Sequence, residues 1–320
     1  MARIAQVGCG HWGKNLTRNF AELGALAAVV EGNPDTARAM SEAHGVPARD
    51  WAEVLADPGI DAVALATPAE THAPLALEAF AAGKHVYVEK PMALSIAEAQ
   101  AMIAAAEAAG RVLMVGHLLH YHPVFRRLKA EVEAGRIGAL RYIYSNRLSL
   151  GKFRTEENVM WSFAPHDVSM ILSLVGAEPE AVTAQGAAHA TAGVADWATM
   201  QLRFAGGVAA HVTASWMHPF KEHRLVVVGE EGMLVFEDSK PVWEEKLTLY
   251  PHRIDTSGQV PVPVRGEAEP IVVEKGEPLR AECAHFIDCI ETGGKPLTDG
   301  AEGLAVLRVL MAADRAMREG

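Results

Sequence analysis

Cysteine is scarce in this sequence of 320 residues, which contains only Cys9, Cys283 and Cys289. Their spacing forms neither a disulfide framework nor a metal-binding pair, so a cysteine-stapled secreted domain is excluded and a reducing compartment is favoured. Cys283 shares a helical spacing with Phe286 and Ile287. We therefore expect it to pack as a small hydrophobic side chain.

Long hydrophobic runs are also lacking. No stretch approaches the roughly 18 uninterrupted apolar residues of a membrane-spanning helix. The chain runs from Met1 directly into a glycine turn, without the apolar segment of a signal peptide. These absences predict a cytoplasmic protein without a membrane partner.

Positive charge is in deficit, with 29 Lys and Arg against 40 Asp and Glu and a net charge of −11 at pH 7. Such a surface repels phosphate backbones, so a small molecule is a better expected partner than nucleic acid. What the sequence does contain is ordinary for a globular protein, with 50% apolar and 22% charged residues. At about 150 residues per domain, the length predicts two domains.

Short apolar runs alternate with helical segments up to about residue 120, which predicts an α/β domain with a doubly wound parallel sheet. The expected strands are Ile4–Val7, Ala27–Val30, Ala62–Ala66, Val86–Val88 and Val112–Val115. From about residue 181 to residue 275 strand follows strand, which indicates a second α/β domain with a large, open, mostly antiparallel sheet. We expect domains at 1–120 and 121–320, with the C-terminal helix packing back on the first.

A glycine-rich turn follows the first expected strand and opens a helix. Its sequence, Gly8-Cys9-Gly10-His11-Trp12-Gly13, has the G-x-G-x-x-G spacing of dinucleotide-binding loops. There the first glycine makes the tight turn, the second admits a pyrophosphate and the third lets the helix pack on the strand. Glu31 ends the second strand, where a carboxylate accepts hydrogen bonds from ribose and repels a 2′-phosphate. NAD is therefore favoured over NADP.

A lysine follows the fourth strand in the run Glu89-Lys90-Pro91. The carboxyl end of a parallel strand borders the crevice where such sheets bind ligands. Beside an apolar strand and a positively charged nicotinamide, the Lys90 amine should lose its proton more readily than in water, so it could orient a substrate hydroxyl. Without these surroundings, a surface lysine in a turn would be the default interpretation.

The glycine loop, Ala66-Thr67-Pro68 with His72, and Glu89-Lys90-Pro91 together resemble the glucose–fructose oxidoreductase/inositol dehydrogenase family of sugar dehydrogenases. The resemblance implies an N-terminal Rossmann domain followed by a domain that forms one wall of the substrate cleft and often the oligomer interface. It assigns Lys90 to catalysis and to both ligands, and it adds Thr67, Pro68, His72 and Glu89 to the residues that bind the cofactor. A homo-oligomer, dimer or tetramer, is expected.

The segment 144–167 has a narrower resemblance, to the branch that oxidises carbon 3 of UDP-N-acetylglucosamine. It places the catalytic histidine at His166, at the expected start of a helix near Pro165. A neutral imidazole can take the hydroxyl proton, because its pKa lies near neutral pH. Many relatives carry an aspartate where this chain has Ser162, and Asp167 could compensate only if it points inward. The division of labour between Lys90 and His166 therefore stays open.

Several side chains of the second half are candidates for contacting the substrate. Arg147, Lys152 and Arg154 suit a diphosphate, although a solvated loop balanced by Glu156 and Glu157 is an equal alternative. Trp161 could stack on a sugar or on uracil, although a lone tryptophan more often simply packs. The expected substrate-binding set is completed by Tyr121 and Asn158.

Three histidines, His117, His120 and His122, follow the fifth strand. On an extended segment His120 and His122 would point together and His117 away, and no further ligand shows metal spacing, so we expect no metal site. His120 and Tyr121 could line the cleft or simply pack.

These observations predict an NAD-dependent dehydrogenase that oxidises a secondary hydroxyl of a UDP-sugar. Two alternatives stay open. The first is the same chemistry on a free sugar or inositol, and the second is a regulatory protein that senses NAD without turnover.

Overall fold

The computed structural model describes residues 1–319, and the chain divides into two compact units. The first comprises Met1–Tyr121 together with Glu277–Leu307, and the second comprises His122–Gly276 and the chain from Arg308 onward. Residues 277–307 thus lie in the first unit. The sequence-based division placed them within 121–320, with the C-terminal helix packing back on the first domain.

The first unit contains a five-stranded parallel sheet in the order β2-β1-β3-β4-β5. Each strand lies within one residue of a predicted apolar run: β1 Ile4–Val7, β2 Leu26–Val30, β3 Ala62–Leu65, β4 His85–Glu89 and β5 Leu113–Gly116. Every residue of β1, β3 and β5 is buried, as expected for strands covered on both faces. Because the strands are parallel, the segments after them meet at one edge of the sheet.

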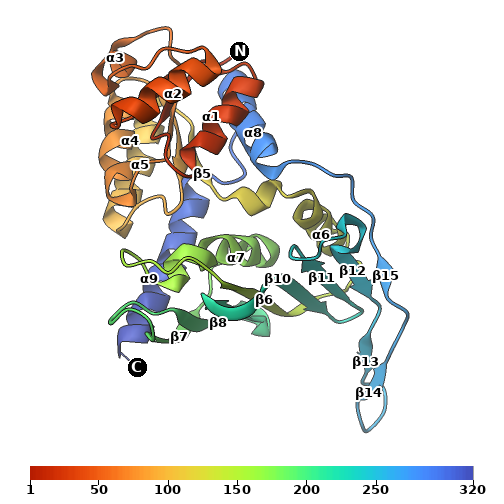
Figure 1. Cartoon of the computed structure of the whole chain (residues 1–320). Helices are drawn as coiled ribbons and strands as arrows, with labels where there is room; N and C mark the ends of the chain where they lie inside the picture. The colour runs from red at the N-terminus through yellow and green to blue at the C-terminus, as the bar shows by residue number, and fades with distance from the viewer. Residues whose placement is uncertain (320) are drawn as a thin grey trace. The chain divides into compact units, whose positions relative to one another are not determined.

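Helices and short turns connect these strands, and Figure 1 shows α4 and α5 side by side. In chain order they are α1 Gly13–Glu22, α2 Pro34–His44, α3 Trp51–Ala56, η1 Ala69–Thr71, α4 His72–Ala81, α5 Ile96–Ala109 and η2 Leu118–Tyr121. Two helices come from the end of the chain, α8 Pro278–Thr292 and α9 Gly300–Glu319, and the division between the units falls within α9.

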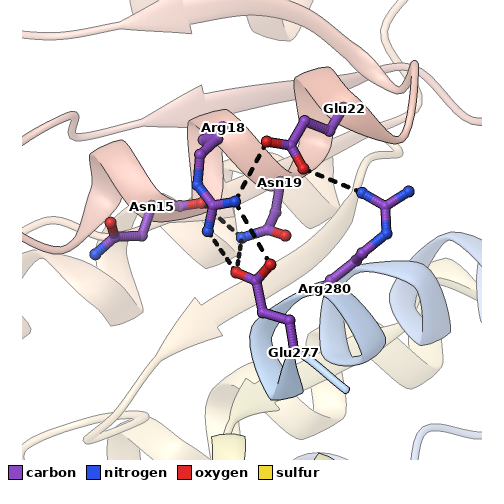
Figure 2. A network of polar contacts seen from close by, with 6 residues as sticks. All are labelled: Asn15, Arg18, Asn19, Glu22, Glu277 and Arg280. Atoms are coloured by element: carbon purple, nitrogen blue, oxygen red, sulfur yellow. Dashed lines mark hydrogen bonds and ion pairs between the residues drawn. The ribbon is translucent and has the colours of Figure 1, made fainter. Parts of the chain in front are cut away.

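A polar network and an aromatic core join α8 to α1 and explain why residues 277–307 belong to the first unit. Figure 2 shows Glu277 accepting hydrogen bonds from Arg18 and Asn19, while Glu22 pairs with Arg18 and Arg280. Beneath this network, Phe20, Tyr87 and Phe286 meet edge to face. Cys283 is buried in the same cluster, so the prediction that it packs as a hydrophobic side chain is confirmed. The contacts between α1 and α8 join parts of the chain about 260 residues apart, and no local sequence pattern predicts them.

The second unit contains an eight-stranded, mostly antiparallel sheet in the order β15-β12-β11-β10-β6-β9-β8-β7, in which only β6 and β9 run parallel. Its helices α6 Pro123–Glu133 and α7 Val159–Val175 contact the sheet. Its strands are β6 Leu140–Leu150, β7 Ala181–Ala187, β8 Trp197–Arg203, β9 Ala209–Ser215, β10 Met217–Gly229, β11 Met233–Glu237, β12 Leu247–Tyr250 and β15 Glu269–Pro270. Along β8 buried side chains alternate with partly or fully exposed ones, as in a sheet with one covered face.

Smaller elements complete the second unit. A two-stranded hairpin, β13 Arg253–Asp255 with β14 Val262–Val264, extends from the sheet in Figure 1. Two short turns, η3 Ala205–Gly207 and η4 Trp243–Glu245, lie between strands. The fold class predicted from the sequence is confirmed: a Rossmann-type parallel sheet and a second α/β domain with a large open sheet.

The start of α7 corrects one prediction. The sequence suggested a helix beginning near Pro165, but α7 begins at Val159. The Asn158 side chain accepts hydrogen bonds from the backbone N–H groups of Met160 and Trp161, so it caps the helix six residues earlier than expected. Pro165 then lies inside the helix, where it removes one backbone hydrogen bond, a loss that the extensive burial of α7 outweighs.

Across residues 1–319, none of the helices combines the length and the apolar character that crossing a membrane would require.

Candidate active site

The three glycines of the loop after β1 occupy three different environments. Gly8 has φ +80°, and a Cβ there would lie 2.6 Å from the carbonyl oxygen of Ala66. A Cβ on Gly13 would lie 2.0 Å from the carbonyl oxygen of Gly8, whereas a Cβ on Gly10 would meet no heavy atom within 4 Å. The first and third glycines are thus required by packing, and the second leaves open space. This is the division of roles in loops that bind a pyrophosphate.

Glu31 is held against this loop. Its Oε2 accepts a hydrogen bond from the Cys9 N–H at 2.7 Å, and its Oε1 accepts one from the Asn33 N–H at 3.0 Å. The side chain is partly exposed, so the carboxylate keeps accepting capacity beside the glycine loop. These residues fit an adenosine ribose with two free hydroxyls.

Cys9 and His11 occupy two of the three variable positions of the glycine loop, and they differ in burial. Burial raises the pKa of the Cys9 thiol to about 11, so the thiol stays neutral, and its hydroxyl neighbour Thr17 lies 3.9 Å from the sulfur. Cys9 therefore acts through its backbone. The His11 side chain is exposed on the loop.

Trp12 connects the glycine loop to the end of β4. Its indole N–H donates to Oε1 of Glu89 at 2.6 Å, and the Tyr87 hydroxyl lies 3.0 Å from the same oxygen. Glu89 is only 8% exposed, and burial raises its pKa even though Trp12, Lys90 and Tyr87 act in the opposite direction. The Glu89 side chain therefore faces the interior. From the sequence we expected it to contact the cofactor. Lys90 follows it, half-buried, at the edge where the strands end.

His72 joins two of the segments at this edge. Its Nδ1 lies 2.8 Å from the carbonyl oxygen of Pro91, and its Nε2 lies 3.0 Å from that of Thr67. Burial lowers the pKa of His72, which favours the neutral ring. The Thr67 hydroxyl accepts from the Thr71 hydroxyl at 2.7 Å, and Pro68 is exposed. His72 thus links the backbone after Lys90 to the backbone at Thr67.

In the second unit, His166 lies in the middle of α7 rather than at its start, because the Asn158 cap lengthens the helix. It is half-buried. The neighbouring Asp167 is buried and points to β6, where it accepts from the Ser145 hydroxyl at 2.6 Å and from Arg147 at 2.5 Å and 3.1 Å. Asp167 is therefore committed to Arg147.

This pairing divides the expected basic cluster. The Arg147 guanidinium is mostly buried and neutralised by Asp167, so it is a poor candidate for a diphosphate. Arg154 is 40% exposed and lies 3.0 Å from Glu157 and 3.8 Å from Glu156, and Lys152 is exposed. Of the three predicted cations, Lys152 and Arg154 present their charge to solvent.

Two other candidates, Asn158 and Tyr121, have structural partners. The Asn158 side chain caps α7 and donates to Asp314 at 3.0 Å. Tyr121 is 2% exposed within the core of the first unit, with its hydroxyl 3.4 Å from that of Thr298, and burial raises its pKa. Both were predicted to bind substrate; in the structure Asn158 caps α7 and Tyr121 packs in the core. Trp161 is half-buried in the first turn of α7.

The three histidines after β5 are arranged differently from the prediction. Residues 118–121 form η2 rather than an extended segment, so His117 and His120 face the same carboxylate, Glu302, at 2.6 Å and 3.8 Å. His122 points elsewhere: its Nδ1 accepts from the backbone N–H of Val124, and its Nε2 lies 3.5 Å from Asp238. Within residues 1–319, no group of three His, Cys, Asp or Glu side chains has a metal-binding arrangement.

Sequence reasoning missed two buried residues near Glu89. Tyr87 precedes it by two positions, and Glu282 approaches from α8. The available signal was an acidic residue on a helix face otherwise made of Leu279, Cys283 and Phe286. A charged residue in an apolar stripe is buried against a partner or serves a function.

Two family models cover most of the chain. The model described as "Oxidoreductase family, NAD-binding Rossmann fold" matches residues 2–117, and the "GFO/IDH/MocA C-terminal domain" matches residues 125–235. NAD is therefore the cofactor of this fold, in agreement with the open glycine loop and Glu31.

Relatives of known activity resemble the whole chain. UDP-N-acetylglucosamine 3-dehydrogenase from Acidithiobacillus ferrooxidans is 33% identical over 311 residues, covering 95% of this chain and 94% of that protein. A solved structure of that enzyme superposes with a TM-score of 0.88 at 28% identity, covering 99% of this chain and 97% of the other. Scyllo-inositol 2-dehydrogenase (NAD(+)) from Bacillus subtilis is 26% identical and covers 99% of this chain and 94% of that protein. These relatives are dehydrogenases of a UDP-sugar and of an inositol, and the chain belongs to the GFO/IDH/MocA family of oxidoreductases.

Proposed function

We propose that this protein oxidises a secondary hydroxyl of a nucleotide-activated amino sugar, with carbon 3 of UDP-N-acetylglucosamine as the site of reaction. The observation that carries the proposal is the 33% identity to a UDP-N-acetylglucosamine 3-dehydrogenase over nearly the full length of both chains. The exposed charges of Lys152 and Arg154, just before α7, add to it, because cations suit a diphosphate.

The cofactor side of the reaction rests on residues of the first unit. The loop from Gly8 to Gly13 would hold the pyrophosphate, and Glu31 would bind the ribose hydroxyls. When bound, NAD supplies the acceptor for the hydride that leaves the oxidised carbon.

Lys90 and His166 are the residues that we propose act on the substrate hydroxyl. Lys90, at the carboxyl end of β4, would orient the hydroxyl and polarise it. His166, as a neutral imidazole on α7, would take its proton as the carbonyl forms. Asp167, the acidic neighbour of His166 in the sequence, accepts hydrogen bonds from Ser145 and Arg147.

The alternative substrate is a free sugar or inositol, which the identity to scyllo-inositol 2-dehydrogenase favours. The two candidates differ in the diphosphate. Turnover should be measured as reduced nicotinamide formed from NAD with UDP-N-acetylglucosamine, N-acetylglucosamine, myo-inositol and scyllo-inositol. We expect turnover with the UDP-sugar and little with the others. Preferential oxidation of an inositol would reject the UDP-sugar proposal, and NAD binding without turnover on any substrate would favour a sensing role.

A further inference from the structure

A buried acid of α8 lies next to the candidate active site without belonging to it. The Glu282 side chain is 0% exposed, and its Oε2 lies 3.0 Å from the Tyr87 hydroxyl, itself fully buried in β4. Its helix neighbours Leu279, Cys283 and Phe286 are buried and apolar. An ionised carboxylate is costly in such surroundings unless it is paired.

The number of available protons limits how Tyr87 can hydrogen-bond to the two carboxyl groups beside it. The Tyr87 hydroxyl oxygen lies 3.0 Å from Oε1 of Glu89 and 3.0 Å from Oε2 of Glu282. A phenol has one proton and can donate to only one of these oxygens, while an ionised carboxylate can only accept. Two ionised carboxylates would therefore leave one oxygen pair in contact with no hydrogen between them. One of the two carboxyl groups must carry a proton.

The surroundings decide which one it is. Burial raises the pKa of Glu89, but it is opposed by hydrogen bonds from the Trp12 indole at 2.6 Å and the Lys90 backbone N–H at 3.3 Å and by the charge of Lys90. Glu282 has no such support: its Oε1 makes no hydrogen bond within residues 1–319, and the charges that face it are those of Glu89 and Glu302. Burial raises the pKa of Glu282 well above its ordinary value.

We propose that Glu282 and Tyr87 are positioning residues, with Glu282 held as a neutral acid that donates to Tyr87 so that Tyr87 donates to Glu89. Glu89 then stays ionised and holds the Trp12 indole on the cofactor loop beside Lys90. The meaning of this arrangement for catalysis rests on the proposed function, but its proton order does not. Gly116 packs closely against this pair, because a Cβ there would lie 2.6 Å from the Tyr87 oxygen and 2.9 Å from Oε1 of Glu89.

Two glutamine variants distinguish the two possible proton orders, because glutamine imitates a protonated glutamate and cannot ionise. We expect E282Q to behave like the native protein and E89Q to be disturbed. The first readout is the Trp12 indole N–H resonance in protein carrying ¹⁵N-labelled tryptophan, assigned among the 6 tryptophans with Trp12→Phe. The second is the Kd for NAD measured by calorimetry. For Tyr87→Phe, which removes a donor to an ionised Glu89, we expect a shifted indole resonance and a Kd for NAD raised about tenfold.

Each outcome decides the proposal. A native-like E89Q with a disturbed E282Q would place the proton on Glu89 and overturn the assignment, and disturbance of both variants would do the same. Native-like behaviour of E89Q, E282Q and Tyr87→Phe would show that the network positions nothing. No sugar is used, so an incorrect substrate class would leave these results intact. Absence of NAD binding would reject the proposed function, while the indole resonance would still report the proton order.

Discussion

The exposure of a charged side chain separates candidate ligand-binding residues from structural ones. Arg147 is buried against Asp167 at 2.5 Å, while Arg154 pairs with Glu157 at 3.0 Å and is 40% exposed. A buried ion pair that loses one member leaves an uncompensated charge, whereas an exposed pair can exchange partners at little cost. Arg154 can therefore leave Glu157 for a ligand, and Arg147 is fixed.

Replacing Lys90 with alanine tests its role in the chemistry. Removal of a group that orients a reacting hydroxyl and shares its proton should lower kcat by about 10²–10⁴-fold. The Kd for NAD should change by less than about threefold, because the loop and Glu31 hold the cofactor. Steady-state turnover with UDP-N-acetylglucosamine and calorimetry with NAD check the two parts.

Lys295→Ala is the matched control for Lys90→Ala, since this lysine is 79% exposed and paired with Asp299. It should leave both quantities unchanged. Native turnover in Lys90→Ala would remove the lysine from the mechanism.

Arg154→Ala tests the diphosphate contact. Loss of one charge-assisted hydrogen bond, worth about 1.5–3 kcal/mol, should raise the KM for UDP-N-acetylglucosamine by roughly tenfold or more. Free N-acetylglucosamine has no diphosphate, so its affinity should not change. Arg203→Ala, which removes an exposed arginine paired with Glu180, is the control. An equal loss of affinity for both sugars would exclude the diphosphate role.

At the scale of elements, the glycine loop provides a matched pair of substitutions. In Gly10→Ala the new methyl group meets no heavy atom within 4 Å, so the protein should keep its melting temperature while NAD binds more weakly. In Gly13→Ala the methyl group would lie 2.0 Å from the carbonyl oxygen of Gly8, so α1 must shift, at a cost of about 1–3 kcal/mol or more.

Thermal melts with and without NAD check this pair, since a ligand stabilises the state that binds it. Gly258→Ala, in an open loop of the second unit, is the control. If Gly10→Ala kept the full NAD-dependent rise in melting temperature, the open side of Gly10 would not be where the pyrophosphate lies.

Elements whose cause is local could be predicted from the sequence. The five strands of the first sheet are short buried runs, and the glycine loop is a pattern of six residues, so both could be recognised in place. The start of α7 was also local, but Pro165 suggested a start that the Asn158 cap overrules.

Contacts between distant segments could not be predicted in the same way. Asp167 was a possible partner of His166, and only the packing of α7 on β6 turns it to Arg147. The addition of residues 277–307 to the first unit involves Glu277 meeting Arg18 and the burial of Phe286, and Tyr121 is buried in the same core as Phe286. The periodicity of a single sequence does not indicate which distant residues contact each other.

At the scale of the whole molecule, each unit contains a histidine that folding keeps neutral. Burial and the charge of Arg111 lower the pKa of His85 to about 4, and its Nδ1 accepts from the Val112 N–H at 2.9 Å. In the second unit, burial and the charge of Arg147 lower the pKa of His223 to about 3. Both values lie below the ordinary 6.5 that each ring regains on unfolding.

The sign of the pH dependence follows from these directions. Below pH 6.5 these two imidazoles bind protons in the unfolded chain but stay unprotonated in the folded protein. The free energy of unfolding therefore falls as the pH decreases. The loss should extend to about pH 4 for the first unit and to about pH 3 for the second.

Hydrogen exchange, followed peptide by peptide between pH 6.5 and these limits, measures each unit separately. We expect His85→Asn to flatten the slope in the first unit only and His223→Asn in the second only, since asparagine can accept where Nδ1 does but does not titrate. The exposed His11→Asn should change neither slope. If His85→Asn and His223→Asn left both slopes as they are, the acid sensitivity would come from carboxylates rather than from these two rings.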